Sequence, residues 1–299
     1  MAAQIITIAI EKGGAGKTVT ASNLAYLMGD EGKKVLCIDT DPQGNLTSAL
    51  SGGNGITSGV YNGKALFDMF DGFRYTRTRD YIVETEYENV DMIPCSAQTP
   101  RINQRIPGIF EDAQTYFKPG DPKCLSNMGE FLYYFLNQVR EDYDYIIIDC
   151  PAGIEQGFKN AIAAAKRAIV VTTPEVSAIR DADRIIGILN ANEIPRIDLV
   201  VNRVRQDMVK RGEMMSVEDV VEILGVNHIG SVYDDENIVI ASNRGTPIAT
   251  KNCVAGRAYD HIAMRICGQD LAKEEKRSRL FGWLKKKDKD VHKIQSQRL

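Results

Sequence analysis

A glycine-rich stretch near the N-terminus has the residue types that a phosphate-binding loop needs. It reads Gly13-Gly14-Ala15-Gly16-Lys17-Thr18. Glycines let backbone N–H groups turn inward around phosphate oxygens, and a helix that begins at the end of the loop offers its positive end to the same anion. Lys17 would then reach the β and γ phosphates, and the Thr18 hydroxyl would be a Mg²⁺ ligand. The alternative is a glycine-rich turn without a ligand.

Aspartates at the ends of two apolar runs supply the acids that such a loop requires. Asp149 ends the run "YIIID", and an aspartate in that place holds the Mg²⁺ water shell beside the loop threonine. In "IDTDPQGN", Asp39 or Asp41 would orient the attacking water or contact Mg²⁺. A plain turn is equally compatible with that stretch, because Asp-Pro also initiates turns. Together these residues predict ATP and Mg²⁺ as cofactors.

Positioning these groups requires strands that end at one edge of a sheet. Six short apolar runs, rich in β-branched residues and without strict alternation, are typical of strands buried on both faces of a parallel sheet. Helical patterns separate many of them. The sequence therefore predicts an α/β fold, a doubly wound and mostly parallel sheet flanked by helices. The predicted strands are 5–10, 34–39, 90–94, 145–149, 168–173 and 197–202, and the predicted helices are 20–30, 125–140, 157–166 and 178–191.

Composition adds few further constraints. The chain has 299 residues, 43% of them hydrophobic and 26% charged, which suits a globular protein with a large core. The six cysteines contain no CxxC pair, so we expect reduced thiols and no structural metal site. No run approaches the ~20 apolar residues of a spanning helix, and no secretion signal is expected. We expect a mobile loop at 51–63 and an irregular excursion at 101–123.

The C-terminal segment differs from the rest in charge. Residues 273–299 carry ten Lys/Arg and four Asp/Glu, whereas the preceding residues are net acidic. Such a tail suits an anionic partner, membrane or nucleic acid, or is simply solvated. On a helix over about 274–287, the apolar side chains gather within an arc of about 160° that lysines flank. Leu280, Phe281, Trp283 and Leu284 would then enter a membrane surface, or else pack on the domain. We expect one domain at 1–268 and this tail at 269–299.

A second lysine, Lys12, precedes the glycines, and "KGGAGKT" resembles the deviant Walker A motif of the MinD/ParA family of P-loop ATPases. In that family the extra lysine crosses the interface of an ATP-bound homodimer and touches the partner's nucleotide. The resemblance implies the same role for Lys12 and a role in hydrolysis for Asp41. A cation delivered in this way neutralises charge that develops in phosphoryl transfer. Val19 stands where many members carry Thr or Ser, so one hydrogen bond to the α-phosphate is expected to be missing.

The resemblance covers nearly the whole chain, but the two halves resemble different branches of the family. The N-terminal half resembles the ParA branch, and residues from about Asp149 onward resemble the MinD branch. It implies that Asn202 contacts adenine and that the stretch after Val232, including Asp234, lines the other side of the base. It also puts Glu175 and Asp181 at the dimer interface; the alternative for those charges is a solvated helix start.

The resemblance implies a function that depends on the tail. The MinD branch implies an ATPase of division-site placement that hydrolyses ATP to ADP and phosphate and cycles on and off the inner face of the cell membrane. Its partners would be an anionic membrane surface, a division inhibitor and an activating topological factor. A ParA-like partition ATPase that binds DNA non-specifically is the alternative, but it needs basic patches on an otherwise acidic body. A third possibility is a nucleotide-bound scaffold with negligible turnover.

Overall fold

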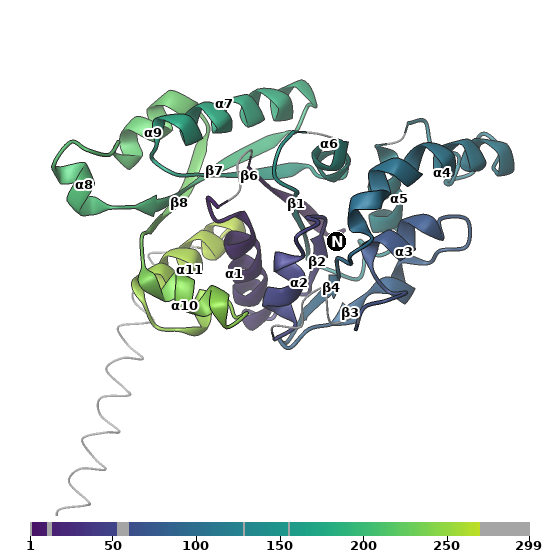
Figure 1. Cartoon of the computed structure of the whole chain (residues 1–299), viewed down its shortest axis with the longest axis horizontal. Helices are drawn as coiled ribbons and strands as arrows, with labels where there is room; N and C mark the ends of the chain where they lie inside the picture. Colours follow the sequence, from purple (N-terminus) through teal and green to yellow (C-terminus); the bar gives the residue numbers. More distant parts are fainter. Residues whose placement is uncertain (1, 11–13, 53–59, 128, 155, 270–299) are drawn as a thin grey trace, which may run out of the picture.

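Eight strands form one sheet among the described residues, in the order β3–β4–β2–β5–β1–β6–β7–β8. All neighbouring strands are parallel except β3 and β4. The computed structural model describes residues 2–10, 14–52, 60–127, 129–154 and 156–269 (Figure 1). The strands are β1 (Gln4–Ala9), β2 (Val35–Asp39), β3 (Val83–Glu84), β4 (Val90–Ile93), β5 (Tyr145–Asp149), β6 (Arg167–Thr172), β7 (Arg196–Val204) and β8 (Asn227–Tyr233).

Successive residues of the central strands enter two different cores. In β5, Ile146 and Ile148 belong to one hydrophobic cluster, whereas Ile147 belongs to the other. In β6, Ala168 and Ile169 divide between the same two clusters. Because side chains alternate between the faces of a strand, apolar residues at consecutive positions mean that both faces are covered. This explains why the apolar runs show no alternation.

Helices cover the two faces of the sheet and connect its parallel strands. In Figure 1, α1, α10 and α11 lie on one side of the sheet and α6, α7 and α9 on the other. The helices are α1 (Lys17–Asp30), α2 (Asn45–Leu50), α3 (Leu66–Asp71), α4 (Ile102–Tyr116), α5 (Glu130–Asn137), α6 (Gln156–Ala163), α7 (Val176–Ala191), α8 (Gln206–Lys210), α9 (Val217–Leu224), α10 (Glu236–Asn243) and α11 (Val254–Ile266), with the 3-10 turns η2 (Thr78–Tyr81), η3 (Thr99–Arg101) and η4 (Ile248–Thr250). The predicted doubly wound α/β architecture is confirmed.

The segment predicted as an irregular excursion is mostly helical, so that prediction is wrong. Helix α4 continues through Pro107, although proline cannot donate a hydrogen bond to the preceding turn. Its buried side chains, Ile102, Ile106, Ile109 and Ala113, recur at three- or four-residue intervals. They join the core cluster on that face of the sheet. This packing outweighs the local cost of the proline.

Two strands and one expected loop also differ from the predictions. Strands β3 and β8, at the two edges of the sheet, were not predicted. Only two residues pair in β3. In β8, Gly230 and polar residues interrupt the apolar pattern. Most of the loop predicted at 51–63, and the tail residues Leu280, Phe281, Trp283 and Leu284, lie outside the described residues. No helix within the described part of the chain has the length and apolar character needed to cross a membrane.

Candidate nucleotide site

The glycine-rich loop joins the end of β1 to the start of α1, as predicted. Gly14 and Gly16 have φ values of 93° and 100°, a region that glycine adopts without the steric cost of a side chain. Gly16 is the N-cap of α1, and no side chain of the described structure caps that helix. The first backbone N–H groups of α1 therefore remain available to an anion. Lys12 and Gly13 lie outside the described residues.

The amino group of Lys17 stands between two carboxylates from neighbouring strands. Its Nζ lies 3.0 Å from Oδ2 of Asp41 and 3.0 Å from Oδ1 of Asp149, and it also donates to the backbone carbonyl of Cys150. Strand register explains the meeting, because Asp149 of β5 pairs with Asp39 of β2 on one side and with Ile8 of β1 on the other. Three elements far apart in sequence thus deliver their charged groups to one edge of the sheet.

Burial and charge act in opposite directions on these groups. Burial alone would lower the pKa of Lys17, but the carboxylates of Asp149 and Asp41 outweigh it and raise that pKa. Burial also raises the pKa of Asp149, although Lys17 and Thr18 oppose the change. Burial, followed by the charge of Asp149, raises the pKa of Asp39 to about 7. The site therefore concentrates negative charge around one cation, an arrangement suited to accepting a further cation with the nucleotide.

Thr18 and Asp149 fit the requirements of a Mg²⁺ site. The Thr18 hydroxyl donates a 2.7 Å hydrogen bond to Oδ2 of Asp149, so both oxygens already point at one another. Mg²⁺ takes few protein ligands and usually keeps several waters beside the phosphates of its substrate. One hydroxyl and one carboxylate are therefore a sufficient protein contribution. Asp41, the third predicted ligand, contacts Lys17 and accepts a 3.0 Å hydrogen bond from the backbone N–H of Gln43.

Asn202 packs directly against the glycine loop. Its side-chain amide donates a 2.7 Å hydrogen bond to the carbonyl of Ala15, and its side-chain oxygen accepts from the backbone N–H of Arg203. A methyl group on Gly16 would collide with this amide. Arg203 itself has a φ of 55°, which is unusual for a residue other than glycine. The end of β7 is therefore fitted closely to the phosphate-binding loop.

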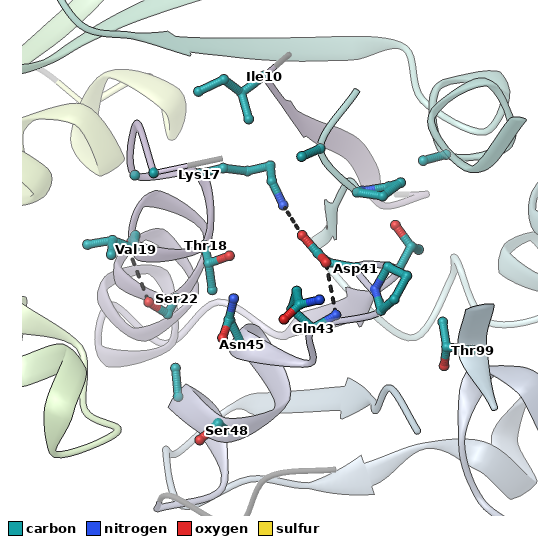
Figure 2. Close-up of a pocket in the computed structure, with 18 of the residues that line it drawn as sticks. Ile10, Lys17, Thr18, Val19, Ser22, Asp41, Gln43, Asn45, Ser48 and Thr99 are labelled. Carbon is teal, nitrogen blue, oxygen red and sulfur yellow. Dashed lines mark hydrogen bonds and ion pairs between the residues drawn. The ribbon is translucent and has the colours of Figure 1, made fainter. Parts of the chain in front are cut away.

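A cavity of about 820 Å³ opens at this edge of the sheet. Figure 2 shows Lys17 reaching toward Asp41, with Thr18, Gln43 and Asn45 around the same space. The volume falls within the range of ligand sites, about 300–1,000 Å³. The glycine loop, Asp41 and the start of α1 all face it. Its lining includes Gly14, Gly16, Lys17, Thr18, Val19, Asp41, Arg203, Ile238 and Thr246.

Two other predicted residues line a neighbouring cavity. Glu175 and Asp234 line this second space, which lies between the ends of β6, β7 and β8 and shares Arg203 with the first. Glu175 is the N-cap of α7, and Asp181 lies half-buried within that helix. Arg203, which lines both spaces, was not predicted. A basic residue that follows a strand-end asparagine has no distinctive pattern of its own.

Val19 and Ala15 belong to the loop region but differ in exposure. Ala15 is buried. Val19 is half-buried, packs on the core cluster that contains Ile6 and Ile8, and lines the first cavity. Its carbonyl accepts hydrogen bonds from Ser22 and Asn23, 3.2 Å and 2.6 Å away. The valine side chain therefore gives this part of the cavity wall an apolar surface.

Comparisons with known proteins agree with this geometry. Residues 3–196 match a family model described as an AAA domain, and residues 126–267 match one described as NUBPL iron-transfer P-loop NTPase. The chain is 37% identical over 271 residues to the septum site-determining protein MinD of a Synechocystis species, which covers 90% of this chain and 91% of that protein.

Two solved structures from Aquifex aeolicus are also similar. The MinD cell division protein has a TM-score of 0.71 and 31% identity, and the match covers 90% of this chain and 99% of that one. A chain of the MinC:MinD cell division protein complex has a TM-score of 0.71 and 30% identity, with 90% and 97% covered. The similarity to MinD proteins spans both halves of the sequence.

Proposed function

Because this chain belongs to the MinD/ParA family of P-loop ATPases, we propose that it is a dimerising ATPase of division-site placement that cycles on and off the inner face of the cell membrane. The observation that carries the proposal is the clustering of Lys17, Asp41 and Asp149 at the glycine loop, in a chain whose relatives are named septum site-determining proteins. The cycle would consume ATP and release ADP and phosphate.

Different residues of the chain would bind the phosphates, the metal and the base of ATP. The loop 13–18 and the start of α1 hold the phosphates, and Lys17 neutralises part of their charge. Thr18 and Asp149 hold Mg²⁺, which supplies further neutralisation when bound. Asn202 and the segment after Val232 enclose the base. Asp41, placed beside Lys17 by the β2–α2 connection, supports hydrolysis by orienting the attacking water.

Dimerisation would complete the site. We place Lys12 across the interface, against the phosphates of the partner's nucleotide, where a cation stabilises charge that develops in the transition state. Glu175 and Asp181 of the α7 region would belong to the same interface. ATP then becomes part of the contact between the two copies. This arrangement makes the dimer depend on the nucleotide state.

The tail would convert dimerisation into membrane binding. We propose a boundary at 268, with residues 269–299 as a basic tail whose helix, about 274–287, inserts Leu280, Phe281, Trp283 and Leu284 into anionic lipid. One short helix binds weakly. Two helices on one dimer gain from effective concentration. The relevant partners are a division inhibitor, which the solved complex of MinC with a similar MinD supports, and an activating topological factor.

Vesicle pelleting tests the proposal directly. The full chain is mixed with vesicles rich in phosphatidylglycerol, in ATP or in ADP. We expect ATP-dependent pelleting that Phe281→Glu abolishes. Tyr75→Glu is the matched control, because Tyr75 is an aromatic residue of the body with 80% of its surface exposed, and it should pellet normally.

Two outcomes would contradict the proposal in different ways. Equal pelleting in ADP would remove the nucleotide switch while leaving the anchor. A salt-dependent shift of arbitrary duplex DNA by Phe281→Glu, together with no vesicle binding by the unaltered chain, would favour the partition function instead.

A further inference from the structure

A buried network of hydrogen bonds among Asp39, Thr47 and Cys95 holds the backbone of the loop that carries Asp41. We infer that Thr47 and Cys95 are positioning residues that keep Asp41 in place for ATP hydrolysis. Neither has been given a function above. The inference rests on the role proposed for Asp41, and it extends that role to the residues that fix the backbone of the β2–α2 connection.

Thr47, in α2, joins the ends of the neighbouring strands β2 and β4. Its backbone N–H and its hydroxyl both donate to Oδ2 of Asp39, at 2.8 Å and 2.7 Å. The same hydroxyl accepts a 2.9 Å hydrogen bond from the backbone N–H of Cys95. Asp39 ends β2, and Cys95 follows β4. One hydroxyl thus uses both its donor and its acceptor capacity to tie α2 to two strands.

The backbone of Asp41 is attached to this network at two points. Its N–H donates to Oδ1 of Asp39 at 3.2 Å. Its carbonyl accepts from the Cys95 thiol at 3.1 Å. With both ends of the residue held, the carboxylate reaches Lys17 at 3.0 Å. A thiol is a weak donor, so Thr47 should contribute more to this placement than Cys95.

These residues act through Asp41 and not on the nucleotide. Thr47 and Cys95 are both fully buried. Among the described residues that line the first cavity, Asp41 appears but these two do not. Polar groups buried this completely usually have hydrogen-bond partners. Here the partners are the Asp39 carboxylate for Thr47 and the Asp41 carbonyl for Cys95. A displacement of about 1 Å in a group that orients a reactant can cost up to ~100-fold in rate.

Steady-state ATP hydrolysis by the full chain tests the inference. Thr47→Val keeps the shape and removes the hydroxyl, and we expect kcat to fall about tenfold with KM for ATP changed less than about twofold. Thr47→Ser keeps the hydroxyl and should stay within about twofold of the unaltered chain in kcat. Cys95→Ala should lower kcat less than Thr47→Val does, and Cys95→Ser, which keeps a donor, should restore it.

Hydrogen exchange on the same proteins supplies a second measurement. The amides of Asp41 and Thr47 donate to Asp39, so exchange in the peptide covering 40–50 should accelerate in Thr47→Val and not in Thr47→Ser. If a Thr47→Val protein that retains the native melting temperature has unchanged kcat and unchanged exchange, the inference is overturned. A fall in kcat of the same size in Thr47→Ser and Thr47→Val would also overturn it, because the hydroxyl would then be irrelevant.

Asp41→Ala separates this inference from the proposed function. It is measured in single-turnover conditions, where bound ATP is converted without a need for fast product release. If Asp41→Ala hydrolyses ATP normally, the proposed role of Asp41 fails and the inference fails with it. If Asp41→Ala is inactive while Thr47→Val and Cys95→Ala are normal, only the positioning role is refuted.

Discussion

The hydroxyl of Thr18 donates a 2.7 Å hydrogen bond to Oδ2 of Asp149, a residue 131 positions later in the chain. The bond joins the first turn of α1 to the end of β5. Since a parallel sheet brings strand ends to one edge, two of the three predicted metal ligands meet without any proximity in sequence.

Removal of the Thr18 hydroxyl should weaken nucleotide binding only when magnesium is present. We expect Thr18→Ala to bind ATP at least about tenfold more weakly in Mg²⁺, because a metal ligand is lost. In EDTA the two proteins should bind ATP almost equally. Calorimetric titration in both conditions measures the difference, and Thr18→Ser is the control. A loss of the same size in EDTA would argue against metal ligation.

Loss of the Lys17 charge should destabilise the fold as well as the nucleotide complex. Lys17→Gln leaves Asp41 and Asp149 buried without their shared cation, which we expect to lower the free energy of unfolding by about 3 kcal/mol. Adding Asp41→Asn should recover part of that loss, since one unpaired charge is removed. Urea denaturation of the single and double variants measures their free energies of unfolding. No recovery in the double variant would mean that charge repulsion is not the cause.

Gly14 and Gly16 should tolerate alanine to different degrees. Both have positive φ, so each substitution carries a backbone cost of about 1–3 kcal/mol. Only at Gly16 does the added methyl group also meet the amide of Asn202, whereas at Gly14 it meets open space. Gly16→Ala should therefore lower the melting temperature more than Gly14→Ala. Asn202→Ala in the Gly16→Ala background should reverse the excess, and equal melting temperatures for the two alanine variants would contradict the packing argument.

Asp39 should make the nucleotide-free protein less stable as pH rises toward neutrality. Its pKa is raised to about 7, first by burial and then by Asp149, from 3.8. Between these values the folded state holds a proton that the unfolded state lacks, so raising the pH through this window costs the folded state stability. Above about pH 7 both states are ionised, and the difference becomes constant.

The matched variant for this pH effect is Asp39→Asn. Its lost hydrogen bonds lower stability by the same amount at every pH, so only the slope carries information. Between pH 4 and 7 the unaltered chain should lose stability relative to Asp39→Asn. Denaturation curves at four pH values measure it. Parallel stability profiles for the two proteins would contradict the raised pKa.

The sequence predicts a site feature when that feature depends on residues that are consecutive in the chain. The run 14–18 specifies its own backbone, because Gly14 and Gly16 permit the positive φ values that they adopt there. Strand β5 begins and ends where the apolar run predicted. The acids Asp41 and Asp149 were found because each follows or ends an apolar run beside such a loop. Their closeness to Lys17 follows from the order of parallel strands.

Other features depend on contacts that no local pattern records. Helix α4 forms around Pro107 because Ile102, Ile106 and Ile109 meet the core, and packing of that kind is invisible in the composition of the segment. Strand β8 contains Gly230 and polar residues that interrupt the apolar pattern, and its place in the sheet comes from pairing with β7 through a shifted register. Asp234 and Glu175 line a cavity beside the one that contains the phosphate-binding loop.

The sequence by itself thus determined the fold class, the phosphate-binding loop and the acids that serve it, because each depends on residue types in short spans. Only the tertiary structure decided what supports them. Thr47 and Cys95 are ordinary residues in sequence, yet the pairing of β2 with β4 brings Cys95 to the ends of both strands, where it contacts Thr47 and the carbonyl of Asp41. A hydrogen-bond network between strands is set by their register, and register arises only when the whole sheet has formed.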